Sequence, residues 1–300
     1  MAVYSDSLQK LKEGCKINYY DLCEEYLINC VGVTEDILKA YEKDWKIQRE
    51  FVKKEVKTID DVLKRALHHA KWGSSLIMNF YNYEKEYCFS GKMNNGGNKD
   101  YSALYDFNVK LLAEQNSEDL YESASNYYNQ KKEPFRRFVT NIVELSKIFC
   151  KFDNADSFFR YVDKSVKSDS IADKLNMVRQ FYVCNFKTAK ATDFIKECGY
   201  KGFIKPDRFI SKIFFQLDDL NKIFKDKSNY YEFSKVSKEE KIFISILKYC
   251  DYHGIIPYEF DKILFLVVGR QFYKHNIKIR TKPDENVRDF LKYCNDKGYY

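Results

Sequence analysis

Apolar residues recur along this chain at the three- and four-residue spacing of amphipathic helices. Thr34 can cap a helix whose apolar positions are Ile37, Leu38, Tyr41, Trp45 and Phe51. Thr58 and Asp61 have the spacing of a capping box, which predicts that another helix follows them. The same periodicity predicts helices over residues 76–89, 101–113 and 118–130, the last with Ser117 as its cap.

The strongest apolar pattern follows Pro134, a residue that suits the first turn of a helix. Apolar side chains then occupy most sides of that helix, which predicts that it lies deep in a core: Phe135, Phe138, Val139, Ile142, Val143, Leu145, Ile148 and Phe149. Ser170 opens a further helix, and residues 90–98, rich in Gly and Asn, predict a loop. Because only 4 Pro and 11 Gly interrupt the chain, the pattern favours an all-α fold.

The length of 300 residues allows a two-lobed helical bundle, with an N-terminal lobe at 1–130 and a second core at 131–300. With 25 Tyr and 24 Phe, the chain has far more apolar mass than disordered chains carry. No run approaches the roughly 18 uncharged apolar residues of a membrane span. Nine cysteines without a C-x-x-C pair, and a start without a secretory signal, indicate a reducing, cytoplasmic location and no metal site.

The net charge of +7 makes the chain mildly basic, which fits a solvated surface as well as a surface that binds nucleic acid. A more specific clue is the order of elements over residues 181–210. The pattern there predicts a helix, a tight turn, a second helix, and then an extended approach to Asp207.

This segment resembles the helix-hairpin-helix DNA glycosylases, and the 8-oxoguanine-type branches most closely. In that family a hairpin precedes a Lys-x-Ala sequence, a helix that ends in Gly, and an Asp stretch. The corresponding positions are Lys187-Thr188-Ala189, Gly199 and Asp207, which follows Lys187 by 20 residues. The resemblance covers residues 171–215, and residues 257–273 look like the helix that closes the glycosylase core.

The resemblance implies a base-excision enzyme that removes a damaged base such as an oxidised purine, with or without AP-lyase activity. Lys187 would attack the anomeric carbon and form a Schiff base. Burial or a neighbouring cation such as Lys190 would favour loss of its proton. Asp207, whose pKa the helix start should lower, would stabilise cationic character in the sugar. Neither a metal nor another cofactor is implied.

Double-stranded DNA is the partner that the resemblance implies. Asn185, Lys190, Lys205, Arg208 and Lys212 are then the candidates for contacts with the nucleic acid. A base taken out of the duplex would stack on aromatic side chains, for which the candidates are Phe138, Phe181, Phe186 and Phe209.

Three departures from the family pattern leave alternatives open. Val183 and Asn185 occupy positions where the family hairpin has glycines, although Asn tolerates a positive φ. Phe209 stands where a His is common, and Lys190, 17 residues before Asp207, could take the place of Lys187 as the nucleophile. The second hypothesis is therefore a non-catalytic helical module on the same scaffold that binds nucleic acid or a protein partner.

Overall fold

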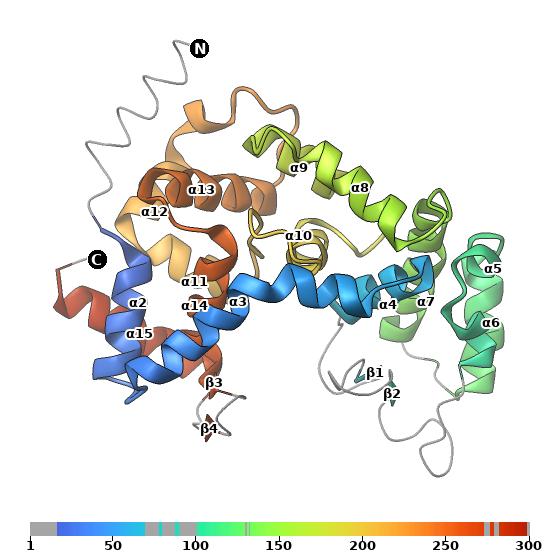
Figure 1. The fold of residues 1–300 in the computed structure, drawn as a ribbon, viewed down its shortest axis with the longest axis horizontal. Helices are drawn as coiled ribbons and strands as arrows, with labels where there is room; N and C mark the ends of the chain where they lie inside the picture. The colour runs from blue at the N-terminus through green and yellow to red at the C-terminus, as the bar shows by residue number, and fades with distance from the viewer. Residues whose placement is uncertain are drawn as a thin grey trace. The chain divides into compact units, whose positions relative to one another are not determined.

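A computed structural model describes residues 17–69, 78–79, 88–89, 101–129, 131, 133–272, 277–278 and 282–298, and the protein is predominantly helical (Figure 1). The α-helices are α2 (Tyr19–Asn29), α3 (Glu35–Glu55), α4 (Ile59–His69), α5 (Val109–Ala113), α6 (Ser117–Tyr127), α7 (Glu133–Phe149), α8 (Ala155–Ser165), α9 (Ile171–Arg179), α10 (Thr188–Glu197), α11 (Arg208–Gln216), α12 (Asp218–Lys225), α13 (Lys238–His253), α14 (Pro257–Gly269) and α15 (Pro283–Asp296). Two short 3₁₀ helices are η1 (Ser102–Phe107) and η2 (Lys227–Tyr230). The all-α class expected from the sequence is confirmed.

The chain forms two compact units, each assembled from separate stretches of sequence. Unit 1 comprises Met1–Glu50, Asp169–Leu175 and Ile195–Tyr300, and unit 2 comprises Phe51–Ser168 and Asn176–Phe194. Three helices, α3, α9 and α10, each continue from one unit into the other. The sequence analysis expected a boundary between two lobes at residue 130, but residues on both sides of that position belong to unit 2.

In unit 2, α7 packs against α4, α5 and α6, as Figure 1 shows for the green helices. Its buried side chains include Phe135, Phe138 and Phe149, as the apolar sequence after Pro134 predicts. Phe149 also contacts the rings of Phe158, Phe181 and Phe194, at centroid distances of 5.8 to 5.9 Å. These rings form the centre of the unit.

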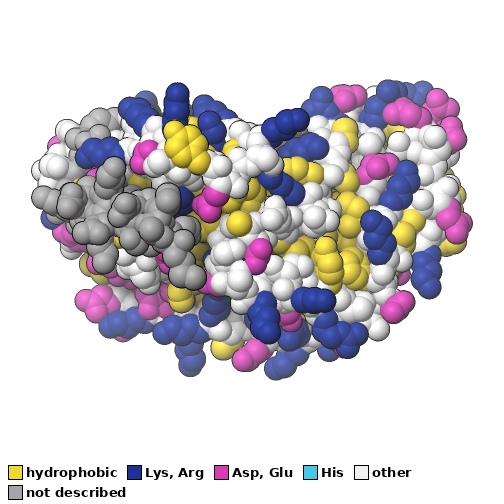
Figure 2. Space-filling model, turned by 90° about the horizontal axis from the view of Figure 1, so that it is seen from above, with side chains coloured by type: hydrophobic (Ala, Val, Ile, Leu, Met, Phe, Trp, Pro, Cys, Tyr) yellow, Lys and Arg dark blue, Asp and Glu magenta, His cyan; other side chains and the backbone are white. Residues whose placement is uncertain are grey.

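In unit 1, α13 and α14 contact each other, and α2 and α15 pack on α14. The Tyr249 hydroxyl fixes the start of α2, because it donates to the Ile17 carbonyl and accepts from the Tyr19 N–H, both at 2.7 Å. The buried Asn286 side chain donates to the Val268 carbonyl at 2.7 Å and joins α15 to α14. On the face drawn in Figure 2, basic side chains are interspersed with acidic ones.

Several helix starts agree with the sequence analysis. Thr58 and Asp61 form the expected reciprocal cap, with distances of 2.9 and 3.1 Å. The Ser170 hydroxyl accepts from the Asp173 N–H at 3.0 Å at the start of α9. At α6, however, Asn116 supplies the cap in place of Ser117, because the Asn116 side chain accepts from the first free N–H groups.

Two of the expected helices were wrong in part. Within residues 76–89 the structure has the strands β1 (Met78–Asn79) and β2 (Cys88–Phe89), which pair antiparallel. The aromatic residues that suggested a helix there also favour strands. Residues 101–113 form η1 and α5 instead of one helix, because the backbone from Tyr105 to Phe107 turns left-handed, with φ between 50° and 62°.

A second strand pair, β3 (Gln271–Phe272) and β4 (Ile277–Lys278), is also antiparallel. The expected loop at residues 90–98 lies outside the described residues. In the part of the chain that the structure describes, no helix combines the length and apolar character that crossing a bilayer requires.

Candidate functional site

Residues 180–187 connect α9 to α10 in the segment that the sequence analysis singled out, and they contain a two-residue turn. Val183 and Phe186 exchange backbone hydrogen bonds, both at 3.2 Å, so that Cys184 and Asn185 form the tip. The Lys187 carbonyl accepts from the Ala191 N–H at 2.9 Å, which starts α10 directly after the turn. The chain order in this segment is therefore α9, the turn and α10.

Polar groups at the tip of this turn form hydrogen bonds with other residues of unit 2. The Asn185 N–H donates to the side-chain oxygen of Asn141 on α7 at 3.3 Å, and the Lys190 ammonium donates to the Asn185 carbonyl at 2.8 Å. Asn185 does not adopt the positive φ that Asn tolerates. A phosphate that approached the Asn185 amide would have to displace Asn141.

Lys187 lies at the start of α10 with its side chain exposed. Its ammonium is 5.6 Å from the ring centroid of Tyr182, whose hydroxyl forms a 2.7 Å hydrogen bond with the Thr188 hydroxyl. Among the described residues, no carboxylate forms an ion pair with Lys187. The burial expected to remove its proton is not present.

Asp207 is the N-cap of α11 and is half-buried. One oxygen of its carboxyl accepts from the N–H groups of Phe209 and Ile210, at 2.9 and 3.0 Å. Burial raises the pKa of this carboxyl above its ordinary value, against the opposing effects of the Ile210 N–H and the Lys205 charge. The expectation that the helix start lowers the pKa was therefore wrong in its net direction, because desolvation outweighs the hydrogen bonds.

The two candidate catalytic residues belong to different units. Lys187 is in unit 2 and Asp207 is in unit 1, and the structure describes each unit by itself. Their convergence on one open pocket stays a prediction.

The other candidates for contacts with nucleic acid differ in how exposed they are. Lys190 and Lys205 are half-buried, and the Lys205 N–H donates to Asp261 at 2.9 Å. Arg208 and Lys212 are exposed: the Arg208 guanidinium is 4.4 Å from the Phe209 ring centroid, and Lys212 pairs with Asp284. Arg208 is thus the more accessible cation of α11 for an anionic partner.

Three of the four base-pocket candidates are core residues instead. Phe138 stacks on Phe135, Phe181 contacts Phe194 at 5.5 Å, and Phe186 contacts Phe194 at 6.2 Å. Phe181 and Phe186 have no exposed surface and Phe138 has almost none, so a base could not stack on them in this conformation. Phe209 is partly exposed, with two cations, Arg208 and Lys212, near its ring.

A buried ion network in unit 1 was not recognised in the sequence. Lys196 contacts Asp261 at 2.5 Å and Glu197 at 3.3 Å, and Lys262 contacts Glu197 at 2.6 Å. Burial alone would lower the pKa of Lys262, but the Glu197 charge raises it above its ordinary value. The signal in the sequence was the pair of adjacent charged residues at 261 and 262 inside a mostly apolar helix.

This network joins the end of α10 to α14. Lys196 and Glu197 end α10, and Asp261 and Lys262 lie on α14. A 2.9 Å hydrogen bond from the Tyr258 N–H to the Lys201 carbonyl adds a backbone link. No family model matches the chain, and no curated protein or solved structure shows significant similarity to it. Within the described residues, no three His, Cys, Asp or Glu side chains gather where they could hold one metal ion.

Proposed function

We propose that this protein is a non-catalytic helical module that binds nucleic acid through the turn between α9 and α10. One observation carries the proposal. Lys187 presents an exposed ammonium next to Tyr182, and among the described residues no carboxylate neutralises it. A cation beside an aromatic ring suits contact with a phosphate and an adjacent base.

The surroundings of Lys187 support binding more than catalysis. A lysine that forms a Schiff base needs a neutral amine, which burial promotes, and Lys187 is exposed. Lys190, the other candidate nucleophile, is bonded to the Asn185 carbonyl and helps to hold the turn. In this proposal the two helices and the turn have a structural role, and the Lys187 side chain contacts the phosphate in place of backbone amides.

A second candidate function, base excision by a glycosylase, is favoured by the raised pKa of Asp207. A carboxyl whose pKa lies closer to neutrality is better suited to exchange protons during the cleavage of a glycosidic bond. Gly199, with φ 88°, also ends the α10 segment as the family pattern has it. If this function is retained, Asp207→Asn will suppress base release and leave the fold intact, because Asn also caps helices.

Binding is tested by fluorescence anisotropy of a labelled DNA duplex at several salt concentrations. We expect Lys187→Ala to weaken binding and to reduce the slope of log affinity against log salt by about one. Lys187→Arg, which keeps the positive charge, should retain the affinity and the salt slope of the wild type. The matched control is Lys110→Ala on α5, another exposed lysine of unit 2. Unchanged affinity and slope in Lys187→Ala would refute the proposal.

Catalysis is tested separately by borohydride trapping on a duplex that contains 8-oxoguanine. The proposal predicts binding without a covalent adduct. An adduct that disappears in Lys187→Ala would establish the glycosylase function and assign Lys187 as the nucleophile. An adduct that persists in Lys187→Ala and is lost in Lys190→Ala would assign that role to Lys190.

A further inference from the structure

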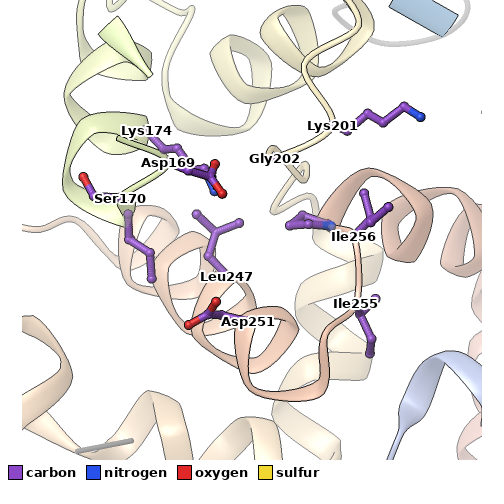
Figure 3. Close-up of a pocket in the computed structure, with 11 residues that line it drawn as sticks. Asp169, Ser170, Lys174, Lys201, Gly202, Leu247, Asp251, Ile255 and Ile256 are labelled. Atoms are coloured by element: carbon purple, nitrogen blue, oxygen red, sulfur yellow. The ribbon is translucent and has the colours of Figure 1, made fainter. Parts of the chain in front are cut away.

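A pocket in unit 1 is lined neither by residues of the α9–α10 turn nor by Asp207. Its walls come from the start of α9, the residues after α10, the last turns of α13 and the segment that leads into α14 (Figure 3). Its volume is about 420 Å³, within the range of roughly 300 to 1,000 Å³ that small-molecule sites occupy. The pocket is therefore large enough for a small organic ligand.

The amine of Lys174 is the buried polar group of this pocket. Its side chain is 9% exposed, and it pairs with the Asp169 carboxylate at 2.7 Å. An ammonium has three N–H donors, and among the described residues Asp169 is its one hydrogen-bonding partner. Lys174 can therefore donate to a ligand in the pocket as well.

Asp169 is a counter-ion that can be displaced. Its side chain is 82% exposed, so water solvates its carboxylate and the pair gains little from a low dielectric. Its backbone is left-handed, with φ 55°, a conformation that non-glycine residues adopt rarely. A ligand carboxylate placed inside the pocket would be less exposed than Asp169, so water would screen its attraction to the same amine less.

Gly202 gives the Lys174 amine its space. A side chain at this position would place its Cβ 2.9 Å from Cε and 3.1 Å from Nζ of Lys174. Because such contacts are too short, any larger residue would push the amine out of place. The glycine thus keeps Lys174 at the wall of the pocket.

The rest of the lining defines the kind of anion. Leu247 points toward the Lys174–Asp169 pair in Figure 3, and Ile171 and Ile255 add aliphatic surface. Lys201 is directed away from the pocket and donates to the Lys46 carbonyl at 3.0 Å. The Asp251 carboxylate also lines the pocket, so the lining combines the Lys174 ammonium, two carboxylates and aliphatic side chains. With one cation directed into it, the pocket suits a single negative charge on an apolar body better than it suits a phosphate dianion.

We propose that this pocket binds a small aliphatic monocarboxylate, whose carboxylate replaces Asp169 on the Lys174 amine while its hydrocarbon chain lies against Leu247 and Ile255. The site is independent of the nucleic-acid proposal, because it uses none of the residues of the α9–α10 turn.

The test measures binding of hexanoate to the full-length protein by calorimetry, with hexanamide as the uncharged comparison. Hexanoate should bind with a Kd of about 1 mM or below, and hexanamide about tenfold more weakly, because it loses the charge-assisted hydrogen bond. Asp169→Asn should tighten hexanoate binding severalfold, since a neutral amide competes poorly for the amine. Lys201→Met, which removes an amine directed away from the pocket, should leave binding unchanged.

Gly202→Ala and Lys174→Met should abolish binding, but either variant could also disturb folding. Asp169→Asn decides the question because it predicts a gain. No binding of hexanoate to either the wild type or Asp169→Asn would overturn the proposal. Equal affinity for hexanoate and hexanamide would overturn it as well, because the site would then select the hydrocarbon and not the charge.

Discussion

Replacement of Lys196 by Met tests whether the buried ion network stabilises unit 1. The side chains of Lys196 and Asp261 are only 4% and 7% exposed, and their charged groups are 2.5 Å apart. Met has nearly the length of the lysine stem and no charge, so the substitution leaves the Asp261 carboxylate buried without its ammonium partner. A buried charge without its partner is strongly destabilising.

The expected loss in the free energy of unfolding is about 3 kcal/mol. Breaking a buried ion pair from one side costs roughly 3 to 5 kcal/mol. The lower end of this range applies here because Asp261 still accepts the hydrogen bond from the Lys205 N–H, and Glu197 still forms its ion pair with Lys262. The double variant Lys196→Met, Asp261→Asn should recover part of the loss, since it removes the unpaired charge and retains an acceptor for Lys205.

Urea denaturation provides the assay, with a fluorescent probe confined to unit 1. The chain has two tryptophans, and Trp45 is buried in unit 1, so the measurement uses a Trp72→Phe background. Lys39→Met is the matched control, because Lys39 forms an exposed pair with Glu35, and no measurable change is expected there. A loss below about 1 kcal/mol in Lys196→Met, or an equal loss in the single and double variants, would refute the reasoning.

Three further predictions concern the neighbourhood of the α10 helix. Gly199→Ala should destabilise the protein by about 3 kcal/mol, because Gly199 has φ 88° and a Cβ would lie 2.6 Å from the Arg49 Cα. Thermal unfolding measures this loss, and an unchanged midpoint would contradict it. Lys190→Ala should speed hydrogen exchange at Asn185 and lower stability by about 1 kcal/mol, whereas unaltered exchange would show that the turn does not depend on this contact. Because the pKa of Asp207 is raised in the folded protein, its protonated carboxyl contributes fully to the free energy of unfolding below about pH 4. That contribution is lost as the pH rises through the pKa of the folded state. Asp207→Asn should therefore be at least as stable as wild type at pH 7, with the difference narrowing in acid; urea midpoints at both pH values check this, and a less stable variant at pH 7 would contradict it.

Local signals in the sequence predicted the helical fold well. The capping residues Thr58 and Ser170, and the apolar pattern after Pro134, all lie where the expected helices begin. These signals succeed because capping and amphipathic periodicity act within a few residues of the chain. The α9–α10 turn was also predictable, since two apolar segments flank a short polar tip.

Contacts between distant residues were not predictable by the same reasoning. Nothing near Asn185 indicates that Asn141, on another helix, occupies its amide. Likewise, the sequence allowed Phe181 and Phe186 a place in a base pocket, although aromatic residues in so aromatic a chain are more often core residues, and their contacts with Phe194 place them in the core. The net pKa shift of Asp207 depended on burial, which the cap motif alone does not determine.

Over residues 171–215, the spacing of the candidate residues and their capacity for catalysis depend on different parts of the structure. The spacing of Lys187, Gly199 and Asp207 follows from the lengths of the turn, α10 and the segment before α11, so the scaffold alone can maintain it. Catalysis also needs a buried amine and an accessible turn, and those properties depend on residues outside the spacing, such as Asn141. The same spacing is therefore compatible with a turn that has no accessible backbone amides for a phosphate and that supports one exposed lysine. Lys187 is exposed and the Asn185 backbone groups are hydrogen-bonded within unit 2, so binding at Lys187 is the more direct hypothesis to test.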